Sequence, residues 1–161
     1  MRAALYRVAD RLLSLYWFLL RPRTVGARCI LLCARHLLLI RQTYGHQLWT
    51  LPGGGLARGE TLEAAVRREV KEEVGITLGA VRYLGHFVST QTYNVDTVHV
   101  FSAATPSQAC TIAPGEIAEA RWFALEALPR VSEKTRQALR LWQQNNTGAA
   151  APIVRGESRL I

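Results

Sequence analysis

The sequence predicts a mixed α/β domain preceded by an amphipathic helix, and three observations support this fold class. Short apolar runs bounded by glycine, proline and turn residues alternate with two stretches of helical periodicity. The 161 residues, 49% of them hydrophobic, suffice for one core but are few for two. No internal repeat or low-complexity linker divides the chain. We therefore expect one mixed sheet with a few helices over residues 25–145.

The first element is an amphipathic helix within a basic segment, residues 1–24. Apolar residues recur every three or four positions over residues 5–20, arginines follow the opposite face, and Pro22 should end the helix. The unbroken apolar run, residues 15–20, is far shorter than the ~20 residues that cross a bilayer. Three roles remain open for residues 1–22: packing on the domain or in a homodimer interface, peripheral contact with an anionic membrane, or a cleaved signal peptide.

The next elements alternate between strand and helix patterns. Apolar runs predict strands at 27–34 and 37–41, joined near Arg35 and His36, and a further strand at 47–51. The glycines after Pro52 should interrupt regular structure over residues 52–55. Helical periodicity then covers residues 61–74, with Thr61 as the N-cap and Gly75 as the stop.

The second half returns to strands and ends in a helix. Strands are expected at 81–90 and 95–104 with Asn94 at the turn, followed by a loop at 105–115 and a strand at 120–123. A second helix should run from Ser132 to about residue 144. The segment from residue 146 is rich in alanine and glycine without a period, and we expect a loose tail there.

The charge is concentrated in the first part of the chain. The net charge is +8, and residues 1–28 carry six arginines against Asp10, so +5 of it lies there. The remainder is nearly balanced, which makes nucleic acid an unlikely partner. Three cysteines offer no even disulfide framework and favour a cytoplasmic protein, in contact with the inner face of the membrane if residues 1–22 bind lipid. His46, His86 and His99 follow no ligand pattern, so we expect structural roles for them.

The candidate chemistry lies in residues 53–76, which hold five of the twelve acidic residues. On a helix, Glu69, Glu72 and Glu73 project from one face, where like charges repel. A hard divalent cation such as Mg²⁺ or Mn²⁺ would reverse that repulsion. The glycine run Gly53–Gly55 lets a polyphosphate approach the backbone closely, so these glycines are candidate substrate-binding residues.

These residues resemble the Nudix hydrolase family. Gly54, five residues, Glu60, seven residues and then the run Arg68-Glu69-Val70-Lys71-Glu72-Glu73-Val74-Gly75-Ile76 reproduce every required position of the Nudix box. The resemblance implies the Nudix α/β/α sandwich and Mg²⁺-dependent hydrolysis of a phosphoanhydride bond in a nucleoside diphosphate linked to another group.

The resemblance also implies roles for individual residues. The family's metal ligands correspond to Glu69, Glu72 and Glu73, joined by the carbonyl of Gly54. Arg68 would hold a glutamate of the box by an ion pair, and Glu60 would brace the loop. Glu116, in the loop before the last strand, would be a fourth ligand or the general base.

The resemblance leaves the base and the substrate open. Many members have a glutamate in the box loop where this chain has Ala57, so Glu73, Glu116 and Glu119 compete as the base. Tyr93 stands near the place where dinucleoside polyphosphate hydrolases stack a base. The expected partner is a small-molecule diphosphate. The alternatives are the 5′ end of an RNA, a lipid-linked pyrophosphate, or a non-catalytic module that binds a ligand.

Overall fold

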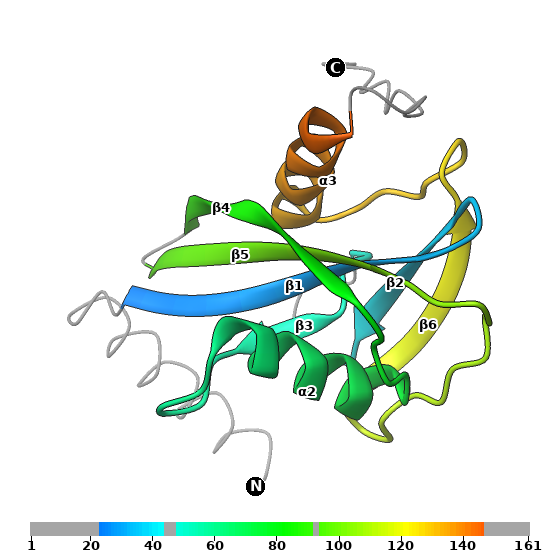
Figure 1. The fold of residues 1–161 in the computed structure, drawn as a ribbon, viewed down its shortest axis with the longest axis horizontal. Coiled ribbons are helices and arrows are strands. Elements are labelled where there is room, and N and C mark those ends of the chain that lie inside the picture. Colours follow the sequence, from blue (N-terminus) through cyan, green and yellow to red (C-terminus); the bar gives the residue numbers. More distant parts are fainter. Residues whose placement is uncertain (1–22, 44–47, 92–93, 147–161) are drawn as a thin grey trace, which may run out of the picture.

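One mixed sheet with a helix on each face forms the part of the chain that the structure describes, residues 23–43, 48–91 and 94–146 (Figure 1). This computed structural model confirms the predicted mixed α/β class. The predicted N-terminal helix, Tyr93 and residues 147–161 lie outside the described residues. The strands are β1 (Arg23–Cys33), β2 (His36–Gln42), β3 (Gly53–Gly55), β4 (Val81–Gln91), β5 (Asn94–Ala104) and β6 (Ile117–Ala124), and the helices are α2 (Leu62–Val74) and α3 (Glu133–Asn145).

Strand β1 is the centre of the sheet. The order is β4-β5-β1-β2-β6, and β3 also pairs with β1. β1 runs parallel to β5 along ten residue pairs, whereas its pairings with β2 and β3 are antiparallel. It accommodates three partners because residues 26–28 face β3 and residues 32–33 face β2 on the same edge. The glycine strand is therefore fixed at the middle of the fold.

Both faces of the sheet are buried, each by one helix (Figure 1). Alternate residues of β1 point to opposite faces, so Cys29 packs with the α2 residues Val66 and Val70, and Ile30 packs with the α3 residue Leu139. Burial on both faces explains why β1 is apolar without interruption from Cys29 to Cys33.

Helix α2 has the ends that the sequence predicts. The Thr61 hydroxyl accepts a hydrogen bond from the Ala64 N–H at 3.2 Å, which satisfies a free donor of the first turn. Gly75 adopts φ 71° and its N–H donates to the Lys71 carbonyl at 3.0 Å. These caps fix which helix positions face the sheet, and thereby where the glutamates lie.

Several predicted boundaries are wrong in the first half of the chain. β1 begins at Arg23 instead of residue 27, because β5 supplies a parallel partner for its first residues. The turn lies at Ala34 and Arg35, with Ala34 at φ 51°, so His36 belongs to β2. Residues 48–51 form only two isolated bridges and no strand. Gly53–Gly55 was expected to interrupt regular structure but forms β3.

In the second half of the chain, the observed boundaries agree more closely with the predicted ones. β4 and β5 match the predicted strands within one residue at each end. β6 begins three residues earlier than predicted because its first residues pair with Arg41 and Gln42 across a bulge in β2. Helix α3 starts after the N-cap Ser132 and extends to Asn145. Within the described residues, no helix is long and apolar enough to span a membrane.

Candidate functional site

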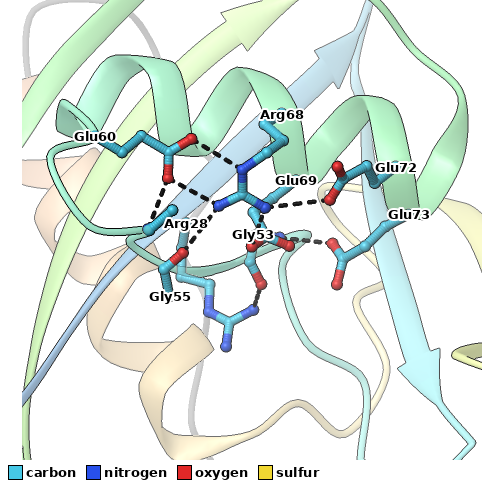
Figure 2. Close-up of polar contacts among 9 residues, drawn as sticks. Arg28, Gly53, Gly55, Glu60, Arg68, Glu69, Glu72 and Glu73 are labelled. Atoms are coloured by element: carbon cyan, nitrogen blue, oxygen red, sulfur yellow. Dashed lines mark hydrogen bonds and ion pairs between the residues drawn. The ribbon is translucent and has the colours of Figure 1, made fainter.

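Helix α2 turns its acidic side toward β3 and the preceding loop (Figure 2). The three glutamates at the end of the box, Glu69, Glu72 and Glu73, have different environments. The side chain of Glu72 is 59% exposed, that of Glu69 only 15%, and Glu73 as a residue only 2%. The acidic face of α2, which the spacing of these glutamates predicts, therefore extends from solvent at Glu72 into the core at Glu73.

Glu73 is a buried carboxylate held by the glycine strand. The Gly53 N–H donates to its Oε2 at 2.7 Å. Burial raises the pKa of Glu73 to about 7, against the opposing effects of the Gly53 hydrogen bond and the Arg28 charge, and the nearby charges of Glu69 and Glu116 raise it further. An acid with such a pKa can hold or release a proton near neutral pH.

Two glycines of β3 are closely packed, Gly53 against β1 and Gly54 against α2. A Cβ at Gly53, which adopts φ 132°, would overlap the Ala27 carbonyl oxygen of β1. A Cβ at Gly54 would lie 2.5 Å from Oε1 and from the carboxylate carbon of Glu69. Gly53 therefore cannot carry a side chain against β1, and a side chain at Gly54 would displace the Glu69 carboxylate.

Arg68 connects the acidic residues around it (Figure 2). Its Nε and Nη2 donate to the two oxygens of Glu60 at 2.8 and 2.9 Å. Its Nη1 donates to Glu69 at 2.8 Å and to Glu72 at 3.1 Å, and Nη2 also reaches the Gly55 carbonyl at 3.1 Å. Hydrogen bonds from Arg68 hold the pKa of Glu60 at about 2. Glu60 in turn accepts the Ala57 N–H at 2.8 Å, so this pair braces the loop.

Arg28 is a site residue that the sequence reasoning did not identify. Its Nη1 donates to the Gly53 carbonyl, and at 3.4 Å to the Leu51 carbonyl. Burial lowers the pKa of Arg28, while the charges of Glu73, Asp96 and Glu69 raise it. The sequence signal that could have identified it is the position of Arg28 directly before the apolar run of β1, because a buried charge needs a polar partner.

The two remaining base candidates lie in different environments. Glu116 is exposed in the loop before β6, and its charge acts on Glu73. Glu119 lies on β6 and is ion-paired with Arg41 and Arg121. The structure brings Glu116 toward the α2 glutamates and keeps Glu119 engaged elsewhere.

The donor set suits a hard divalent cation. Glu69, Glu72, Glu73 and the Gly54 carbonyl offer only oxygen ligands, which Mg²⁺ and Mn²⁺ prefer. The negative charges of Glu69 and Glu116 disfavour the ionised form of Glu73, and a bound cation would relieve this repulsion. Among the described residues, no three His, Cys, Asp or Glu side chains are grouped closely enough to hold a metal ion, and Glu69 and Glu72 are hydrogen-bonded to Arg68 instead. A cation would thus compete with Arg68 for both carboxylates.

Comparison with known families agrees with this geometry. The sequence model of the NUDIX domain matches residues 22–142. The chain belongs to the NUDIX domain family.

Curated Nudix relatives include two NAD-capped RNA hydrolases named NudC. The protein from Vibrio atlanticus is 33% identical over 110 residues, which cover 65% of this chain and 39% of the relative. The protein from Deinococcus radiodurans is 36% identical over 84 residues, or 52% of this chain and 29% of the relative. The chain thus spans about two fifths or less of the length of these relatives.

Solved Nudix structures share the fold. A MutT NUDIX hydrolase from Burkholderia pseudomallei superposes with a TM-score of 0.69 at 28% identity, covering 74% of this chain and 98% of that one. The NUDIX domain of Shewanella oneidensis NrtR, complexed with ADP ribose, gives a TM-score of 0.68 at 18% identity, covering 78% and 90%. At that identity the second likeness concerns the fold alone.

Gly54→Ala should weaken binding of a divalent cation and leave the Nudix fold intact. The added Cβ meets the flexible end of Glu69, which can move aside at little cost, but the carboxylate then leaves its place beside β3. We expect at least about a tenfold loss of Mn²⁺ affinity by calorimetry, in line with other disturbances of ligand orientation. Gly79→Ala is the matched control, because no atom lies within 4 Å of its Cβ position. Equal affinity in the two variants would contradict the prediction.

Glu73→Gln should stabilise the metal-free protein at high pH. The folded-state pKa of about 7 exceeds the ordinary value of 4.5, so the folded state holds a proton in this window and stability falls as pH rises toward 7. Glutamine remains neutral and still accepts the Gly53 N–H. We expect the variant to exceed the wild type by on the order of 2 kcal/mol at pH 8 and to match it near pH 4.

Chemical denaturation in EDTA at both pH values measures this difference. Glu72→Gln, at an exposed position, is the control and should show no such pH dependence. A stability difference in Glu73→Gln that is the same at pH 4 and pH 8 would contradict the assignment.

Proposed function

We propose that this chain hydrolyses a phosphoanhydride bond in a nucleoside diphosphate linked to another group, with Mg²⁺ or Mn²⁺ as the cofactor. The observation that carries the proposal is the buried Glu73 carboxylate against the Gly53 N–H, with Glu69 beside Gly54 and Glu72 at the solvent edge. Nudix hydrolases generally use divalent metal ions, and the oxygen donors here suit them.

The proposed roles follow the geometry. Glu69, Glu72, Glu73 and the Gly54 carbonyl hold the cation, with Glu116 as a further ligand. The cation, when bound, neutralises diphosphate oxygens and lowers the pKa of a bound water. Arg68 positions Glu60, Glu69 and Glu72 through its hydrogen bonds. The backbone of Gly53–Gly55 offers a close approach to substrate phosphates because no side chain covers it.

The proton of the attacking water goes to Glu73 or Glu116. Glu73 supports this role by its place beside Gly53, whose N–H donates to Oε2 and fixes the carboxylate. Glu116 supports it by its exposure and by its charge acting on Glu73. Glu119 is the weakest candidate, because its carboxylate is ion-paired with Arg41 and Arg121.

A second candidate substrate is the 5′ end of a capped RNA. The curated relatives at 30–36% identity are named NAD-capped RNA hydrolases. A lipid-linked pyrophosphate is the third, if residues 1–22 bring the domain to an anionic membrane from the cytoplasm. The same segment would otherwise pack on the domain or in a homodimer. A ligand-binding module without activity fits least, because every glutamate of the box is present.

A panel of diphosphates should identify the substrate and the role of Glu72. ADP-ribose, a dinucleoside diphosphate, NAD-capped RNA and a lipid-linked pyrophosphate are incubated with Mg²⁺, Mn²⁺ or EDTA, and the products are measured by chromatography. We expect cleavage of at least one compound with metal and none with EDTA. Glu72→Gln should lower kcat at least ~100-fold, since it removes a proposed ligand, and leave the melting temperature nearly unchanged because this side chain is exposed.

Glu63→Gln is the matched control for that variant. Glu63 lies on the same helix, is 56% exposed and pairs with Arg67 outside the site, so its variant should keep wild-type kcat. Full activity of Glu72→Gln, or equal losses in both variants, would contradict the proposal.

Residues 1–22 should account for any membrane contact. We expect the full chain to sediment with anionic phosphatidylserine vesicles and less with neutral ones, whereas a chain lacking residues 1–22 stays in solution. Equal sedimentation of both forms would exclude this role, and gel filtration of the same two forms reports on the homodimer.

A further inference from the structure

Two histidines lie side by side on strands β4 and β5. His86 of β4 and His99 of β5 are directly opposite in the antiparallel register. Their ring centroids are 5.3 Å apart with an angle of 34° between the planes. His86 is exposed and His99 is partly buried. Neither strand contributes a carboxylate of the box, and Ala27 of β1, which pairs with both residues, lies between His99 and Gly54.

A bulge in β4 adds a tyrosine to the same face. The register shifts between Tyr83 and Gly85, and Gly85 adopts φ 130°. Without the bulge, strict alternation would place Tyr83 and His86 on opposite faces. With it, Tyr83 opposes Phe101 and His86 opposes His99, so all four side chains share one face.

Tyr83 orients the ring of His99. Its hydroxyl lies 3.0 Å from Nδ1 of His99. When Nδ1–H donates to that oxygen, Nε2 carries the free lone pair. Metal-binding histidines commonly donate their second ring nitrogen to such a partner, which fixes the tautomer and the ring orientation.

The ring spacing matches that of two imidazoles on one metal ion. Metal–nitrogen distances of about 2.0–2.1 Å and a tetrahedral angle place the two ring centroids about 5 Å apart. Burial, and secondarily the neighbouring His86, lower the pKa of His99, which favours the neutral imidazole that binds metal.

We propose that His86 and His99 form a binding site for a transition-metal ion of the Zn²⁺ or Cu²⁺ type. Imidazole is a preferred ligand for these ions, whereas the oxygen donors on α2 suit Mg²⁺ and Mn²⁺. No third His, Cys, Asp or Glu joins the pair among the described residues, so water completes the coordination. The site is independent of the proposed hydrolase activity. By joining β4 to β5, a bound ion stabilises the folded chain.

Copper binding by the full chain tests this site. With excess Mg²⁺ to occupy the carboxylates, electron paramagnetic resonance at pH 7.5 should show Cu²⁺ coupled to two imidazole nitrogens. His86→Gln and His99→Gln should each remove that two-nitrogen coupling and weaken Cu²⁺ and Zn²⁺ binding at least about tenfold by calorimetry. Tyr83→Phe should retain the two nitrogens and weaken binding to a smaller extent.

Two controls separate this site from the catalytic one. Arg82→Ala, at the neighbouring exposed position of β4, and Glu72→Gln, at the box, should both keep the two-nitrogen spectrum and the affinity. Circular dichroism checks that each variant is folded. An unchanged spectrum and affinity in both histidine variants would overturn the proposal, as would loss of the spectrum in Glu72→Gln.

Discussion

The close packing of β3 between β1 and α2 is the constraint on which the rest of the site depends. Gly53 has no room for a side chain against the Ala27 carbonyl, and a side chain at Gly54 would displace the Glu69 carboxylate. This packing places a backbone N–H within hydrogen-bonding distance of Glu73. Because β1 pairs with β3, β2 and β5, the position of the glycine strand is set by the whole sheet.

The acidic residues of α2 depend on arginines supplied from two directions. Arg68 holds Glu69 and Glu72 from the same helix, and Arg28 approaches the Gly53 carbonyl from β1. Between them, the buried Glu73 has a raised pKa because burial outweighs the attraction of Arg28. Such a carboxylate destabilises the ionised, metal-free protein and is suited to bind a cation or accept a proton. Burial of Glu73 therefore lowers the stability of the metal-free protein while it favours the proposed chemistry.

The sheet carries two kinds of chemistry on the face that α2 covers. The α2 side presents carboxylates next to a bare backbone, where hard cations and phosphates fit. Farther along the same sheet, the bulge at Gly85 gathers Tyr83, His86 and His99 into a group with nitrogen donors. One extra residue in a strand is enough to create this second group, because side-chain direction alternates with every residue.

The sequence by itself determined the class of the fold, the helix α2 with its caps, and the spacing of Glu69, Glu72 and Glu73. These features are local: Thr61 and Gly75 act on their own helix ends, and helical periodicity fixes the face. The Nudix box, a fixed local pattern, identified the family for the same reason.

Only the tertiary structure decided which groups meet across long separations. β1 starts at Arg23 because β5 pairs with it, and Gly53–Gly55 is a strand because β1 offers hydrogen bonds. Arg28 is a site residue because β3 folds next to it and offers the Gly53 carbonyl. The ion pairs of Glu119 with Arg41 and Arg121 distinguish it from Glu116 as a candidate base. Strand pairing, burial and bulges depend on contacts between residues far apart in the chain, and no local pattern records them.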